Sequence, residues 1–122
     1  MTTILLFNYP EPERKAWKFL LRKLPGVRLV PVERGRYGLT IGELLEGKPV
    51  SGLRYGADFS DRMAVFAGAE GALLSLLIDL SHQVTSEKTY RAMLTDNNRS
   101  WTPPELMKEL REEEAQLQRQ MQ

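Results

Sequence analysis

Hydrophobic positions follow two different patterns along the chain, one typical of strands and one typical of helices. Some stretches are short, nearly continuous apolar runs such as "TTILLF", which are typical of β-strands covered on both faces. Between them, apolar residues recur at i, i+3, i+4 and i+7, as they do from Trp17 to Leu24, which is the spacing of one helix face. Strands are predicted at 2–7, 27–32, 62–68 and 88–94, and helices at 12–24, 40–47, 71–82 and from residue 102 onward.

Strands and helices that alternate in this way favour a mostly parallel sheet with helices on both faces. The two most apolar runs, 2–7 and 62–68, belong in the middle of that sheet. Pro31 cannot donate to a strand ladder, so 27–32 is predicted at one edge, and the more polar run 88–94 at the other. With right-handed crossovers the predicted strand order is 2-1-3-4, in a small three-layer α/β sandwich related to the flavodoxin-like fold.

The length of 122 residues predicts a single α/β domain over 1–122. Residues 113–122 are predicted to be the solvated, frayed end of the last helix. The stretch 48–61 shows no period and is predicted to be a long loop. We see no internal repeat in the sequence.

The stretch "LTDNNRSWTPPE" contains the clearest local signal in the chain. Thr102 and Glu105 have the spacing of a capping box, and the two prolines between them suit the first helical turn. Before this helix start, Asn97 and Asn98 either brace the loop or line a site, because asparagine favours turns as well as ligands. Trp101 is predicted to pack between the last helix and the sheet, which leaves room for a site beside it.

Three motifs resemble a family of small bacterial and archaeal proteins known only as a domain of unknown function. That family ends in T-x-x-N-x-x-W-T before an acidic, leucine-containing helix, and Thr95, Asn98, Trp101 and Thr102 fit this spacing. Its first strand ends in Asn, which is similar to "LLFN", and its middle strand runs into aromatic-x-Gly, which is similar to "VFAG". The resemblance implies the same fold and brings no activity, ligand or catalytic residue.

A parallel sheet would bring several polar segments to one rim. In open parallel sheets, ligands bind beyond the carboxyl ends of the strands, where the strand order reverses. The turn "GAEG" before helix 71–82 could hold a phosphate on free amides, although Glu70 places negative charge there. The candidate ligand-binding rim consists of Asn8, Tyr9, Gly68, Glu70, Thr95, Asn97, Asn98 and Trp101.

The amino-acid composition limits which cofactors, partners and locations we expect for this protein. The chain has no cysteine and one histidine, so we expect no metal site and no cofactor, and we identify no catalytic residue. The absence of cysteine and of a signal-peptide pattern favours a cytoplasmic protein. The net charge of +1 gives no general attraction to nucleic acid. The cations concentrated on helix 12–24 are interpreted as a solvated helix face.

We therefore predict a small binding or regulatory domain that acts through protein contacts or a small ligand at the rim. The alternative is a minor enzyme, or a nucleotide- or phosphate-handling protein, that uses the same rim, although the prediction leans away from an enzyme. The expected partner is a small molecule or a protein, with neither a membrane nor nucleic acid expected. Helix 71–82 is apolar almost all round, so we expect a second cover besides the sheet, which is either a neighbouring helix or a second copy of the chain in a homodimer.

Overall fold

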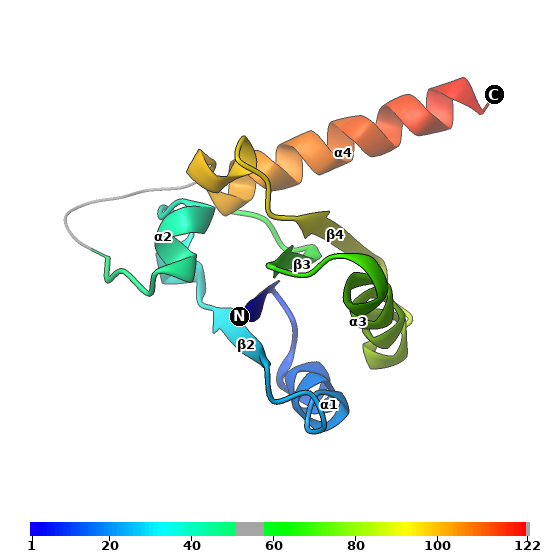
Figure 1. Ribbon diagram of the computed structural model, residues 1–122. Coiled ribbons are helices and arrows are strands. Elements are labelled where there is room, and N and C mark those ends of the chain that lie inside the picture. Colours follow the sequence, from blue (N-terminus) through cyan, green and yellow to red (C-terminus); the bar gives the residue numbers. More distant parts are fainter. Residues whose placement is uncertain (51–57, 122) are drawn as a thin grey trace. The chain divides into compact units, whose positions relative to one another are not determined.

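The computed structural model describes residues 1–50 and 58–121. All four predicted strands and all four predicted helices are present, together with two short 3₁₀ turns, η1 and η2, that the sequence patterns did not indicate (Figure 1). Of the predicted loop 48–61, residues 48–50 and 58–61 carry no helix or strand, and 51–57 lie outside the described residues. The elements are β1 (Thr2–Phe7), α1 (Glu11–Leu20), β2 (Val27–Val32), η1 (Arg34–Arg36), α2 (Ile41–Leu45), β3 (Arg62–Ala67), α3 (Gly71–Val84), β4 (Thr89–Met93), η2 (Asn98–Ser100) and α4 (Pro103–Gln120).

The chain divides into two compact units, and each is built from two segments. Unit 1 comprises Met1–Val32 and Asp61–Leu94, and unit 2 comprises Glu33–Ser60 and Thr95–Gln122. Unit 1 therefore holds the whole sheet with α1 and α3, whereas unit 2 holds α2, α4 and both 3₁₀ turns. That residues 1–122 form a single domain stays a prediction.

The sheet of unit 1 has the predicted order β2-β1-β3-β4, with β2 and β4 at the edges, but it is mixed. The pairs β1/β2 and β3/β4 are parallel, whereas the central strands β1 and β3 are antiparallel. The predicted mostly parallel, flavodoxin-like sheet is therefore wrong in the direction of its central pair. Each parallel pair is joined directly by one helix, which imposes the direction. The connection from β2 to β3 runs through residues 33–61, which is long enough to return to either end of the sheet.

The two halves of unit 1 repeat each other in structure. Leu5 pairs directly with Val65, and the other β1–β3 pairs lie symmetrically about that pair. A half turn about an axis between these two residues exchanges the central strands, and it relates β1-α1-β2 to β3-α3-β4. In the central strands and the helices, each residue of the first half corresponds to the residue 60 positions later in the second half. Trp17 and its counterpart Leu77 are both fully buried. Few of the matched residues are identical, which explains why no repeat is visible in the sequence.

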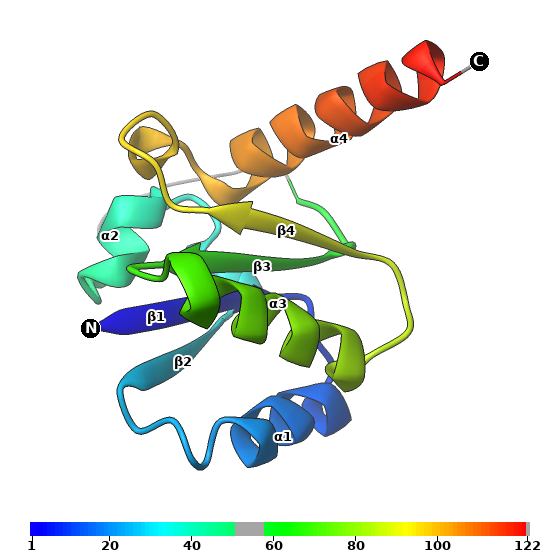
Figure 2. The same cartoon turned by 45° about the vertical axis from the view of Figure 1, so that its right-hand side comes forward.

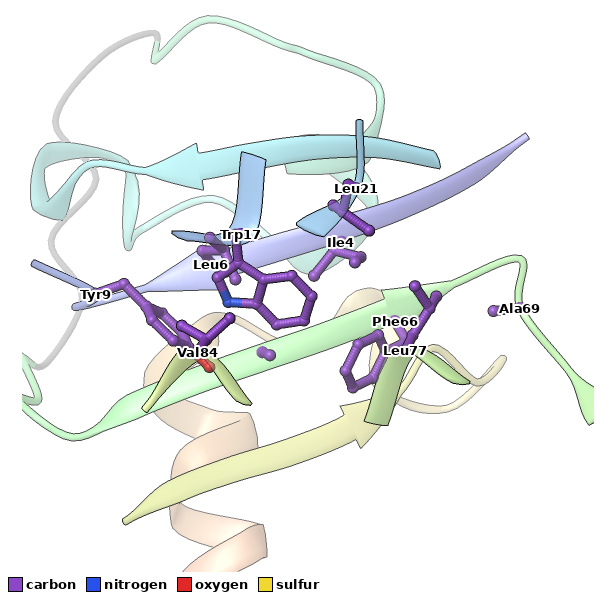
Figure 3. Packing of buried hydrophobic residues seen from close by; sticks show 10 residues of the cluster. Ile4, Leu6, Tyr9, Trp17, Leu21, Phe66, Ala69, Leu77 and Val84 are labelled. Carbon is purple, nitrogen blue, oxygen red and sulfur yellow. The ribbon is translucent and has the colours of Figure 1, made fainter. Parts of the chain in front are cut away.

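The core of unit 1 lies between the sheet and the layer of α1 and α3, which cover one face of it (Figure 2). Figure 3 shows the Trp17 ring at the centre of this core, beside Tyr9 and against the residues of β1. The two rings meet edge to face, with centroids 6.5 Å apart. Truncation of a buried aromatic of this size costs about 3–5 kcal/mol, so Trp17 is a principal anchor of α1. The core consists of Ile4, Leu6, Tyr9, Trp17, Leu21, Ala64, Phe66, Ala69, Leu77 and Val84.

Both capping boxes of unit 2 are confirmed. The Glu43 amide donates to Thr40 Oγ1 at 3.2 Å, and the Thr40 amide donates to Glu43 Oε1 at 3.0 Å. At the start of α4, the Thr102 amide donates to Glu105 Oε1 at 2.9 Å and the Glu105 amide to Thr102 Oγ1 at 3.5 Å. These bonds satisfy amides that a helix start leaves free, so the local sequence determines where both helices begin.

The backbone at Gly68 generates the first testable prediction. Its φ is +77°, and a Cβ there would lie 2.7 Å from the Met1 carbonyl oxygen. Gly68→Ala should therefore destabilise the protein by about 1–2 kcal/mol for the conformation alone, with the contact adding to this. The measurement is urea denaturation, with Gly26→Ala as the matched control because a Cβ at Gly26 meets no atom within 4 Å. Equal effects of the two substitutions would contradict this account.

Candidate functional site

The predicted rim does not form in one place. Because β1 and β3 are antiparallel, Phe7 pairs with Met63 and Thr3 with Ala67. Asn8 and Tyr9 therefore follow β1 at the end of the sheet where β3 begins, whereas Gly68 and Glu70 lie at the opposite end. The expectation that Asn8 and Gly68 share a hollow is wrong, and the mixed direction of the central pair is the physical reason. Ligand binding by any one of these residues is a separate question.

The Asn8 corner is a tight strand-to-helix turn. Asn8 has a φ of 64°, and it is the only non-glycine residue with positive φ in the described ranges 1–50 and 58–121. Its Nδ2 donates to the Asp61 carbonyl at 3.0 Å, which ties the end of β1 to the start of β3. Asparagine tolerates this conformation better than most side chains do, so the turn itself accounts for this residue type.

An ion pair reinforces the same corner. Arg62, at the start of β3, donates from Nε and Nη2 to the two oxygens of Glu13 in α1, at 2.6 and 2.8 Å. Both side chains are largely buried, with exposed fractions of 24% for Arg62 and 15% for Glu13. The hydrogen bond to Glu13 raises the pKa of Arg62 above its ordinary value. This bidentate pair holds the first turn of α1 against β3, and it spans 49 positions of sequence, so no local pattern could have indicated it.

Tyr9 places a phenol inside the core of unit 1. Its side chain is 3% exposed, and its hydroxyl and the Trp17 indole N–H have no hydrogen-bond partner within bonding geometry among the described residues. Burial raises the pKa of the Tyr9 phenol above its ordinary value, while the nearby Thr89, Trp17 and Arg91 side chains act in the opposite direction. Tyr9 is therefore a protonated core residue whose ionisation opposes folding.

The opposite corner is formed by Gly68 and Glu70. The Gly68 carbonyl accepts a hydrogen bond from Thr2 Oγ1 at 3.0 Å, which closes the backbone onto the start of β1. Glu70 is exposed at the N-cap of α3, and its side chain makes no capping hydrogen bond. Gly68 thus makes the turn between strand and helix, and Glu70 adds a negative charge at the helix start.

Unit 2 contains the remaining rim residues, in a compact turn. The Thr95 amide donates to Asn98 Oδ1 at 2.9 Å, and the Asn98 amide donates to Thr95 Oγ1 at 3.0 Å. Asn98 is 6% exposed, whereas Asn97 is exposed. The reciprocal bonds brace the turn from within, which supports the structural interpretation of Asn98 over a free ligand group.

This turn also positions α2. The Trp101 carbonyl accepts the Ile41 amide at 2.8 Å, at the first residue of α2. A Cβ at Gly42 would lie 2.8 Å from Cγ of Arg99, so the turn packs directly on the helix at a position without a side chain. The T-x-x-N-x-x-W-T segment therefore links α2 to the start of α4 within unit 2.

A shallow hollow of about 270 Å³ lies along α4 beside the half-buried Trp101. Glu105 belongs to the capping box, and the backbone and hydroxyl of Thr102 hold the pKa of its carboxyl below the ordinary value. No prediction from the sequence included this hollow, although charged residues recur four and seven positions after Trp101, at Glu105 and Lys108. The hollow is lined by Trp101, Glu105, Lys108, Glu109 and Glu112.

The described residues contain no group of three or more His, Asp or Glu side chains placed to hold a metal ion. Across the same residues, no helix combines the length and apolar character needed to cross a bilayer.

Residues 62–117 match the model of a domain of unknown function, DUF3783. The match runs from β3 into α4 and includes the T-x-x-N-x-x-W-T segment and the aromatic-x-Gly motif, whereas Asn8 lies outside it. The match supports the resemblance to an uncharacterised domain family, and it shows neither the bacterial and archaeal origin nor the motif of that family. No curated protein and no solved structure matches the chain.

The two asparagines of the turn give a matched pair of variants. Asn98→Ala should destabilise the protein by about 1–3 kcal/mol, because it removes the buried acceptor of the Thr95 amide. Asn97→Ala should change the free energy of unfolding by no more than about 0.5 kcal/mol, because its side chain is exposed. Urea denaturation of both variants measures the difference, and a stable Asn98→Ala protein would contradict the bracing role.

The buried phenol predicts a pH dependence. Because the pKa of Tyr9 is raised in the folded state, its contribution to stability is fully present below the unfolded pKa of about 10 and is lost as the pH rises through the folded pKa. The free energy of unfolding of the wild type should fall more steeply above about pH 10 than that of Tyr9→Phe. Chemical denaturation at several pH values measures this, and the difference between the two proteins should be constant below about pH 8. Parallel curves at all pH values would refute the assignment.

Proposed function

We propose that this protein is a non-catalytic binding module that works through protein contacts, and that α3 carries the contact. The observation behind the proposal is the exposure of a large apolar side chain, Leu76, on α3. Leu76 is 41% exposed, and Leu73, Leu74, Ile78 and Leu80, which pack against the core, are only partly buried. Large apolar side chains that stay partly in water on one helix are typical of an interaction surface.

The structural repeat supplies an internal comparison for that surface. The counterparts of Leu73, Leu74 and Ile78 in α1 are Glu13, Arg14 and Lys18, each 60 positions earlier. Two helices in equivalent positions on the same sheet thus carry different chemistry, with charged side chains on α1 and aliphatic ones on α3. The fold accounts for Glu13, which is held by Arg62, and for Arg14, which donates to the Tyr9 carbonyl. The difference that a partner would explain is therefore Ile78 in place of the exposed Lys18.

A second copy of the chain is the partner we propose for this surface. In a two-fold dimer the same patch meets itself, so any charged group on the axis faces a like charge. Residues 71–78 contain no ionisable side chain, and the exposed Asp79, one helical turn from Leu76, would have to lie away from the two-fold axis. The proposal retains a cytoplasmic location, which the cysteine-free sequence favours. An enzyme site that uses one shared rim has no structural basis, because Asn8 and Gly68 lie at opposite ends of the sheet.

Self-association through α3 is tested by Leu76→Glu. The substitution should weaken the dimer by about 2 kcal/mol or more, roughly thirty-fold in Kd, because two carboxylates would meet at the interface. Sedimentation equilibrium over a range of protein concentrations measures the change, and circular dichroism checks that the fold is kept.

Leu117→Glu is the matched control, because Leu117 is 61% exposed on α4 and lies outside the proposed interface. It should leave the dimer intact. A wild-type protein that stays monomeric at all concentrations would refute the proposal, as would equal effects of the two substitutions.

A further inference from the structure

The outward side of α1 and the turn directly after it combine an exposed aromatic ring with four cations. Trp17 faces the core, so residues about half a helical turn away from it face outward. Phe19 is one of them and is 61% exposed. We call this set the basic α1 face; its exposed members are Lys15, Lys18, Phe19, Arg22 and Lys23.

Little within unit 1 neutralises this face. Among the described residues, Lys18 and Lys23 form no ion pair. Lys15 lies 3.3 Å from Glu11, but both side chains are more than two-thirds exposed, so the pair is screened by water. The face therefore carries a net positive charge that remains available to a partner.

Phe19 is the unusual member of the set. Its ring has no polar group, and the Arg22 guanidinium carbon lies 3.8 Å from the ring centroid. Arg22 also donates to the Phe19 carbonyl at 2.8 Å, so the cation is held over the ring. A partner with an apolar layer beneath anionic groups would bind both the cations and the phenyl ring.

We propose that the basic α1 face docks on a membrane surface that contains anionic phospholipid. The cations would pair with the lipid phosphates and carboxylates, and the Phe19 ring would enter the boundary between headgroups and acyl chains. The outward side of a single helix is convex, so it can lie on a flat surface. Proteins that hold a nucleic-acid strand generally do so in a positively charged groove, which a convex helix face does not form. This inference revises the expectation from the sequence that no membrane is a partner, and it does not depend on self-association through α3.

The test is co-sedimentation of the full chain with vesicles of phosphatidylserine and phosphatidylcholine in equal parts. The protein should bind these vesicles, bind pure phosphatidylcholine vesicles far less, and be released as salt is added. Lys18→Gln with Lys23→Gln should lower partitioning about twenty-five-fold, roughly fivefold for each cation. Phe19→Ala should also reduce binding, whereas Phe19→Leu should retain most of it, because insertion needs an apolar side chain and no aromatic one.

The control is Lys48→Gln with Lys108→Gln, which removes two exposed cations of unit 2 and changes the net charge equally. It should bind vesicles within about twofold of the wild type. All substituted side chains are exposed, so circular dichroism should show an unchanged fold. Equal binding to both kinds of vesicle, or equal loss in the control, would overturn the proposal. The proposal would also be overturned if the protein bound a single-stranded RNA oligonucleotide and did not bind vesicles at the same salt concentration. In that case Phe19→Leu should lose its RNA binding.

Discussion

Leu5 and Val65 pair across the two central strands, and the arrangement of unit 1 follows from that one antiparallel pairing. The half turn that relates the strands also relates the helices that follow them, so α1 and α3 come to lie on the same face of the sheet. Each central strand ends in a residue with a left-handed backbone, Asn8 in one half and Gly68 in the other. The same pairing separates these two residues to opposite ends. The fold thus has two equivalent corners where a parallel sheet would have had one shared rim.

The repeat makes the differences between its halves informative. Positions that are equivalent in backbone have the same packing demands, so a difference in side-chain chemistry must have another cause. On the inner side the halves agree, since Trp17 and Leu77 both fill the core. On the outer side they diverge into a basic face with an exposed phenyl ring on α1 and a surface on α3 that exposes Leu76 beside Ser75 and Asp79. The two proposals rest on this divergence, and they assign different partners to neighbouring helices of one layer.

The T-x-x-N-x-x-W-T segment of unit 2 has a structural role for several of its residues. The T-x-x-N-x-x-W-T segment uses Thr95 and Asn98 to brace one turn, the Trp101 carbonyl to receive α2, and Thr102 to start α4. Each of these roles needs a particular hydrogen-bonding group at a fixed spacing, which accounts for the pattern without a ligand. The hollow beside Trp101 is lined by this residue and by charged residues along one side of α4.

The sequence by itself determined the features whose causes are local. It predicted the strands, the helices, both capping boxes and the edge positions of β2 and β4, because side-chain period, proline geometry and N-cap hydrogen bonds act within a few residues. Only the tertiary structure decided the direction of β3 relative to β1. That direction also decided that Asn8 and Gly68 lie at opposite ends of the sheet and do not form one rim. Both strands are apolar on both faces, so their side-chain pattern is the same in either direction, and the connection through residues 33–61 can reach either end of the sheet. The Glu13–Arg62 pair likewise depends on two segments that meet only after the sheet has formed.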